Sequence, residues 1–180
     1  MNDYAVVIYF DERTSEELRN MISKVASYSG NLYMVETGIP PHVTIGAFSA
    51  DNEIRLRERM EEFIHEFSSG EVVFQEIRTF DPKVLFLSPV KNEYLVAANS
   101  RLNEIMDGFF SPADHDYYLP EYWVPHLALA VKLEKEQMKA AKEAVDSLPL
   151  PIVAQVTKAA LARCNPYEEL TVWELECDSE

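Results

Sequence analysis

Two short segments of the sequence share a Pro-His-apolar pattern, and each carries a histidine that could exchange protons with a substrate. The segments are Pro41-His42-Val43-Thr44-Ile45 and Pro125-His126-Leu127-Ala128-Leu129. If each is a β-strand, alternation puts His42 and Thr44 on one face and His126 and Ala128 on the matching face. Two imidazoles on one substrate could act as general base and general acid, as the cleavage of a phosphodiester requires.

Other side chains near these histidines could contact a phosphate or a nucleobase. Strict alternation puts Lys132 on the face of His126, although a solvated strand end explains this lysine equally well. Tyr122 and Trp123 precede the second segment and could stack on a base, while core packing is an equal alternative for Trp123. Tyr9, on the first predicted strand, is a weaker candidate for substrate binding.

The remaining histidines and the two cysteines predict neither a metal site nor a disulfide. His65 falls off the apolar stripe of its helix, and His115 lies between two aspartates that are too close in sequence to converge readily on one ion. Cys164 and Cys177 flank a predicted hairpin turn and would lie far apart along its ladder. We therefore expect reduced thiols, no metal and no cofactor.

Hydrophobic periodicity predicts the same order of elements in both halves of the chain. In the first half we expect strands at 4–10, 42–48 and 72–80, a helix that a Thr14-x-x-Glu17 capping box opens, and a helix at 51–68. In the second half we expect strands at 84–87, 126–131, 152–163 and 168–177, with helices at about 95–109 and 134–148. Each half therefore reads β-α-β-α-β, with one closing strand at the end.

This repeated order predicts a duplicated α+β fold within a single domain over 1–180. The two lobes would comprise about 1–82 and 83–180, each with an antiparallel sheet. A pseudo-twofold relation between them would bring one histidine from each lobe to a central cleft.

Charge and hydropathy limit the partners that the chain could bind. The formal net charge is −15, from 16 basic and 31 acidic residues, which argues against a protein that grips long nucleic acid. A small or local phosphate ligand stays compatible with this charge. No segment approaches the ~18 apolar residues of a membrane span, and the N-terminal residues do not resemble a secretory signal. We expect a cytoplasmic monomer without membrane contact.

The two histidine segments on a duplicated α+β scaffold resemble the 2H phosphoesterase superfamily, and most closely its 2′-5′ RNA ligase and cyclic phosphodiesterase branch. The resemblance implies that His42 and His126 form an acid–base pair and that Thr44 donates a hydrogen bond to a phosphate oxygen. It implies a 2′,3′-cyclic phosphate or a 2′-5′ linkage in a small nucleotide or RNA end as substrate, handled without a metal.

The second segment, His126-Leu127-Ala128, departs from the family pattern because alanine replaces the second hydroxyl. Loss of one such donor typically costs ~10²–10³ in turnover. The sequence therefore leaves two main hypotheses open, a phosphodiesterase with a degenerate second motif and a related module that binds a nucleotide or phosphate without turnover. A protein that keeps the fold for a structural role is a third possibility.

Overall fold

An antiparallel sheet of eight strands forms the framework of the computed structural model, which describes residues 1–90 and 92–177. In spatial order the sheet comprises β5 (Ser111–Pro112), β2 (Val43–Ala50), β1 (Asn2–Phe10), β7 (Ile152–Arg163), β3 (Gly70–Phe80), β4 (Val84–Pro89) and β6 (Leu127–Ala130), with β8 (Glu168–Glu174) paired to β7. The predicted α+β class with antiparallel strands is confirmed.

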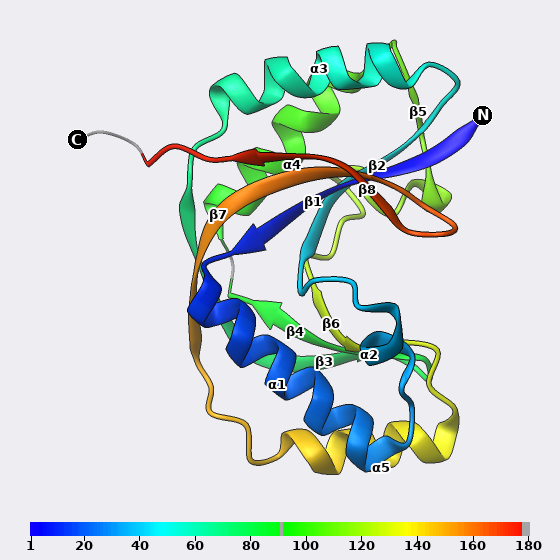
Figure 1. Cartoon of the computed structure of the whole chain (residues 1–180), viewed down its shortest axis with the longest axis vertical. Coiled ribbons are helices and arrows are strands. Elements are labelled where there is room, and N and C mark those ends of the chain that lie inside the picture. Colours follow the sequence, from blue (N-terminus) through cyan, green and yellow to red (C-terminus); the bar gives the residue numbers. More distant parts are fainter. Residues whose placement is uncertain (91, 178–180) are drawn as a thin grey trace.

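The long strand β7 divides this sheet into two lobes (Figure 1). Its C-terminal part pairs with β1 and β8, and its N-terminal part pairs with β3. Val156, where the two parts meet, lies opposite both Phe10 and Gly70. We call the part with β1, β2, β5 and β8 the His42 lobe, and the part with β3, β4 and β6 the His126 lobe. The sheet therefore connects both histidine segments through one strand.

Helices cover the outer faces of the two lobes (Figure 1). The helices are α1 (Glu12–Ser29), α2 (Tyr33–Thr37), α3 (Glu53–Glu66), α4 (Glu93–Met106), α5 (Lys135–Val145) and a short 3-10 turn, η1 (Asp114–Asp116). α3 and α4 pack on the His42 lobe, while α1 and α5 pack on the His126 lobe. Because α1 follows β1 and α4 follows β4, each crosses from the lobe of its strand to the other lobe.

This crossing interleaves the two halves of the sequence in space. The expected lobe boundary near residue 82 falls in the turn between β3 and β4, which are paired strands. Each lobe therefore takes elements from both sides of that boundary. The cause is the central pairing of β3 with β7, which joins the end of one half to the end of the other.

Side-chain burial explains why the apolar runs in the sequence predicted the strands well. In β1, Val6 and Ile8 face the main core, while Val7 and Tyr9 join a second cluster on the opposite face with Ala160 of β7. A strand buried on both faces reads as a continuous apolar run. The second cluster lies on the face of the sheet that carries Thr44, because Val7 of this cluster is opposite Thr44. Buried strand residues therefore underlie the first histidine segment.

The start of α1 differs from the expected capping box. Asp11 is the N-cap, and its carboxylate accepts hydrogen bonds from the Thr14 amide at 2.9 Å and the Thr14 hydroxyl at 2.7 Å. The helix therefore begins at Glu12, because an aspartate one turn earlier satisfies the free amides that Thr14 was expected to cap.

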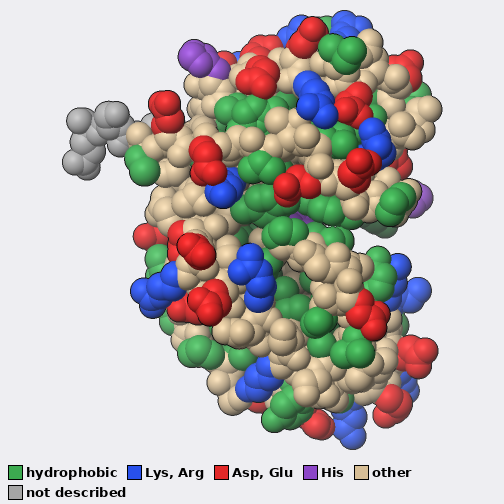
Figure 2. All heavy atoms as spheres, in the orientation of Figure 1, with side chains coloured by type: hydrophobic (Ala, Val, Ile, Leu, Met, Phe, Trp, Pro, Cys, Tyr) green, Lys and Arg blue, Asp and Glu red, His purple; other side chains and the backbone are tan. Residues whose placement is uncertain are grey.

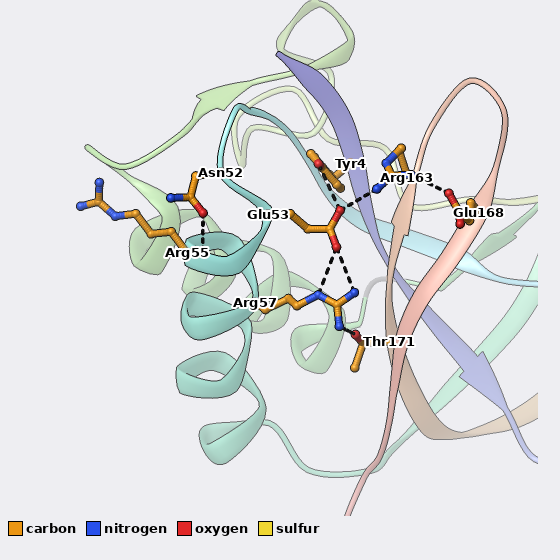
Figure 3. A network of polar contacts seen from close by, with 8 residues as sticks. All are labelled: Tyr4, Asn52, Glu53, Arg55, Arg57, Arg163, Glu168 and Thr171. Carbon is orange, nitrogen blue, oxygen red and sulfur yellow. Dashed lines mark hydrogen bonds and ion pairs between the residues drawn. The ribbon is translucent and has the colours of Figure 1, made fainter.

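A polar network fixes α3 to the strands of the His42 lobe (Figure 3). The Glu53 carboxylate accepts from Arg163 of β7 at 2.7 Å and from Arg57 at 3.0 Å. Arg57 also donates to the Thr171 hydroxyl at 2.6 Å, and Arg163 to Glu168 at 2.6 Å, both on β8. The Glu53 carboxylate thus links α3 to β7, and its two arginine partners extend the network to β8.

Candidate active site

The two predicted histidines have matching local geometry. His42 directly precedes β2, and its Nδ1 lies 2.8 Å from the Pro40 carbonyl oxygen. His126 directly precedes β6, and its Nδ1 lies 2.8 Å from the Val124 carbonyl oxygen. Because a carbonyl oxygen can only accept, Nδ1 of each ring must carry a proton. Nε2 is therefore the basic nitrogen of each neutral imidazole.

Aromatic side chains hold both rings in place. The His42 ring stacks against Tyr167, with 6.2 Å between the ring centroids and 27° between the planes. The His126 ring makes edge contacts with Phe80 at 5.1 Å and with Phe86 at 5.4 Å. Both histidines are half-buried, so each ring is packed on its sides and still partly open to solvent.

Electrostatics couple the two histidines. Burial lowers the pKa of His42, and the positive charge of His126 lowers this pKa further, against the effect of the Pro40 hydrogen bond. Burial also lowers the pKa of His126, although the Val124 hydrogen bond and the Asp114 charge act in the opposite direction. Protonation of one imidazole therefore disfavours protonation of the other.

Figure 2 shows a groove between the two lobes with a histidine side chain inside it.

A cavity of about 350 Å³ lies on the His42 side of this groove. Its lining includes His42, Thr44, Asp114, Tyr118 and Tyr167. Thr44 therefore shares the cavity with His42, as strand alternation predicts. Of the described residues, His126 is not among those that line it, so the cavity represents one side of the groove.

Tyr118 places a second hydroxyl beside Thr44. Burial raises the pKa of Tyr118 to about 12, and the Asp114 charge adds to this effect, while a hydrogen bond with the Thr44 side chain opposes it. The buried amide of Asn99 on α4 fixes this arrangement, because it donates to the carbonyl oxygens of Ile45 at 2.9 Å and Tyr118 at 2.8 Å. Sequence reasoning missed Asn99, whose signal was one polar residue on the apolar face of a helix.

Ala128 has the same spacing from His126 in the sequence as Thr44 has from His42. Thr44 lies opposite Val7 of β1, and Ala128 lies opposite Phe86 of β4. Both follow their histidine by two residues. Ala128 therefore cannot supply near His126 the hydroxyl that Thr44 supplies near His42.

The structure differs from the expectation for Lys132. β6 ends at Ala130, and Lys132 has a left-handed backbone with φ 56°, so strand alternation does not extend to it. Its Nζ lies 4.0 Å from the centroid of the Tyr33 ring on α2. The basis for placing this lysine on the face of His126 is wrong, because the strand ends before it reaches Lys132.

The predicted aromatic residues take three different positions. Trp123 packs against the core, and its indole donates to the Thr44 carbonyl oxygen at 3.1 Å. Tyr122 is 62% exposed. Tyr9 is buried, and its hydroxyl lies 2.7 Å from that of Tyr167 and donates to Glu169 at 2.8 Å. Tyr9 therefore supports the position of Tyr167, which stacks on His42.

A cation that sequence reasoning missed lies on the His126 side. Arg78 of β3 is directly opposite Phe86, and opposed residues in an antiparallel pair share a face of the sheet. Phe86 contacts the His126 ring, so the exposed Arg78 belongs to the same face. The short turn between β3 and β4 could have revealed this register.

The described residues contain no group of three or more His, Cys, Asp or Glu side chains that could hold a metal ion. Cys164 is half-buried and Cys177 is exposed, and both are free thiols.

Within 1–90 and 92–177, no helix has both the length and the apolar character that a membrane span needs.

Comparison with known proteins identifies the family. The model of the 2′-5′ RNA ligase superfamily matches residues 7–166, so the chain belongs to this superfamily, which is of the 2H phosphoesterase type. No curated protein matches the sequence.

Solved structures share the fold at low sequence identity. TT0787 of Thermus thermophilus has a TM-score of 0.62 and 16% identity, over 98% of this chain and 100% of that one. E. coli LigT complexed with 3′-AMP has a TM-score of 0.61 and 11% identity, over 97% and 98%. Kluyveromyces marxianus Usb1 has a TM-score of 0.56 and 15% identity, over 97% and 98%. These likenesses establish the fold.

Proposed function

We propose that the chain is a metal-independent phosphodiesterase that acts on 2′,3′-cyclic phosphates or 2′-5′ linkages of nucleotides and RNA ends. The observation that carries this proposal is the matched pair of histidines. In both, a carbonyl oxygen two residues earlier fixes the proton on Nδ1 and leaves Nε2 as the reactive nitrogen. Two imidazoles with the same tautomer and coupled charges suit a reaction that needs one base and one acid.

In the proposed reaction, neutral His42 takes a proton from water as the water oxygen attacks phosphorus. His126 gives a proton to the 2′ or 3′ oxygen as its bond to phosphorus breaks. The charge of His126 favours the neutral form of His42, and the charge of Asp114 favours the protonated form of His126. Thr44 donates a hydrogen bond to a non-bridging oxygen, where negative charge accumulates.

The strand order supports a duplicated origin of the two lobes. Exchange of β1 with β4, β2 with β6 and β7 with β3 converts the order β2-β1-β7-β3-β4-β6 into itself, read from the other end. We infer that the histidines occupy equivalent positions in this arrangement. One chain supplies both histidines, so the proposed reaction needs no second copy.

Ligands of a structural neighbour support the class of substrate. E. coli LigT has been solved with 3′-AMP and with ATP. The net charge of −15 in our chain favours a short nucleotide or an RNA end over a long polyanion.

Ala128 supports a second candidate function, a module that binds a nucleotide or phosphate without turnover. Its methyl group cannot stabilise the charge that develops on phosphorus oxygens. Loss of one such donor slows turnover by ~10²–10³ and leaves binding contacts elsewhere in place.

The deciding experiment is hydrolysis of a panel of 2′,3′-cyclic nucleotides and 2′-5′ dinucleotides in the presence of EDTA. We expect the wild-type protein to release a monoester, and the His42→Ala and His126→Ala variants to lose this activity. His65→Ala is the matched control, because His65 lies on α3 outside the site. The isomer of the product, 2′ or 3′, identifies the oxygen that receives the proton.

Equal activity in wild type and both histidine variants would contradict the two-histidine mechanism. Calorimetric binding of a nucleotide without any product would favour the binding module, and Ala128→Thr would then test whether the missing hydroxyl accounts for the lost turnover.

A further inference from the structure

The cavity beside His42 is acidic. Asp3 and Asp114 line it, and within residues 1–90 and 92–177 no lysine or arginine does so. The Asp3 carboxylate accepts a hydrogen bond from Ser49, and Asp114 is exposed at the cavity. Phosphate sites usually contain cationic side chains. The presence of a carboxylate beside the proposed phosphate position therefore needs a chemical explanation.

The backbone holds Asp114 at the groove. Asp114, His115 and Asp116 have consecutive left-handed conformations, with φ of 54°, 55° and 65°. The preceding residue, Ala113, is buried and donates from its amide to the Ala47 carbonyl oxygen of β2 at 3.0 Å. Left-handed residues other than glycine are uncommon, and three in succession cost conformational free energy. The fold therefore maintains this loop against a local cost.

The charge of Asp114 acts on both sides of the groove. It raises the pKa of His126 on one side and the pKa of Tyr118 on the other, in each case as a smaller contribution than burial. It also contributes to the raised pKa of the Cys164 thiol. The carboxylate therefore lies close enough to influence a phosphate held between the histidines.

Nearby cations are engaged elsewhere or lie on the far side. Arg163 pairs with Glu53 and Glu168 (Figure 3), and Lys158 pairs with Glu174 at 3.1 Å. Lys132 lies over the Tyr33 ring, and Arg78 lies in the His126 lobe. Among the described residues that line the cavity, His42 is thus the only side chain that can carry a positive charge.

The proposed reaction changes the charge of its ligand. A phosphodiester carries one negative charge. Attack by water breaks one phosphorus–oxygen bond, forms another and gives a monoester, which carries about −1.5 to −2 at neutral pH and releases the remaining proton to solvent. A fixed carboxylate repels the monoester more strongly than the diester, because the Coulomb energy scales with the charge.

We propose that Asp114 is a specificity-determining residue that makes the site prefer a singly charged phosphodiester to a doubly charged phosphate monoester. It disfavours the product relative to the substrate, and it weakens the binding of free nucleoside monophosphates in the groove. This inference rests on the proposed function in that both place a phosphate between His42 and His126.

The test is a comparison of two ligands that differ by one charge, 2′-deoxyadenosine 3′-phosphate and its methyl ester. Neither has a 2′ hydroxyl, so neither can cyclise. We expect wild-type protein to bind the methyl ester more tightly by calorimetry at pH 7.5. In Asp114→Asn, the ratio of the two dissociation constants should shift toward the monoester by about tenfold, as loss of a unit charge at short range predicts.

Asparagine tolerates a left-handed backbone at least as well as aspartate, so the variant removes the charge and keeps the loop. Asp116→Asn is the matched control, because Asp116 is exposed in the same turn and does not line the cavity. This control should leave the ratio unchanged.

Three outcomes would overturn the proposal. An unchanged ratio in Asp114→Asn shows that Asp114 does not sense ligand charge, while the proposed function survives. A parallel loss of both affinities shows that Asp114 supports ligand binding in general and does not discriminate by ligand charge. Absence of binding of either ligand to wild-type protein overturns the proposed function as well.

Discussion

At the scale of single residues, the coupled histidines predict the pH dependence of the reaction. The reactive form has one neutral and one protonated imidazole, and the pKa of each histidine is lowered from 6.5. The pair therefore loses its second proton below the usual histidine range. We expect a bell-shaped profile of kcat/KM with its maximum on the acid side of pH 6.5, measured with a cyclic nucleotide. A maximum above pH 7 would contradict this protonation pattern.

Thr44 gives a second prediction at this scale. Thr44→Ala removes the hydroxyl that faces the cavity, so we expect kcat to fall by about 10²-fold with a smaller change in KM. Thr44→Ser keeps the hydroxyl and should retain most of the activity. Equal losses in the two variants would assign the effect to strand packing.

At the scale of elements, α4 positions the loop that carries Tyr118. Asn99→Ala removes the donor to one buried and one partly buried carbonyl oxygen, and we expect a loss of about 1–3 kcal/mol in the free energy of unfolding. Because Tyr118 lies against Thr44, activity should fall more than the folded fraction does. Denaturant unfolding and kcat/KM, measured on the same sample, check both effects.

Asn103→Ala is the control for this variant. Asn103 also donates to the Tyr118 carbonyl oxygen, at 3.1 Å, but it is only half-buried, and its second hydrogen bond goes to the Asn99 carbonyl oxygen of its own helix, at 2.9 Å. We expect a smaller loss of both stability and activity. Equal effects of the two substitutions would show that the link to β2 is unimportant.

At the scale of the whole molecule, Glu53 ties α3 to β7 through Arg163, and its partners Arg57 and Arg163 extend the network to β8 (Figure 3). The hydrogen bond from Arg163 is the largest cause of the lowered pKa of Glu53. A carboxyl with a lowered folded pKa stabilises the fold above its unfolded pKa, near 4.3, and this contribution disappears as the pH falls through the folded value. The partners are partly exposed, so we expect Glu53→Gln to cost about 1 kcal/mol at pH 7.

Urea unfolding at pH 7 and at pH 3 measures this contribution. The difference between wild type and Glu53→Gln should shrink at the lower pH. Glu62→Gln, which breaks an exposed pair with Arg59 on the same helix, should have little effect at either pH. A difference that persists unchanged at pH 3 would assign the effect to the shape of the side chain.

How far the sequence predicted this molecule also depends on scale. Strands such as β1 and β4 were predictable because their apolar runs reflect burial, whereas α2 was missed because none of its five residues is buried. His42 and Thr44 were placed together by alternation. Asp114 could not be placed, because three left-handed residues set its position and no periodicity encodes them.

The way in which the two halves of the sequence interleave in the lobes could not be predicted from hydrophobic periodicity. Periodicity predicts each element from its own residues, but pairing of β3 with β7 joins residues about eighty positions apart. That pairing decides which helix covers which lobe. The repeated order of elements was therefore predictable from the sequence, while the exchange of α1 and α4 between the lobes was not.

The central place of β7 has a consequence for the way the protein is made. This strand joins β1 to β3, yet it leaves the ribosome after every other described strand except β8. Until it emerges, β1 with β2 and β3 with β4 and β6 are separate ribbons, each with an unpaired edge. Neither lobe can then complete its sheet before β7 has emerged, and a nascent chain that stalls before Ile152 would expose two unpaired strand edges at once.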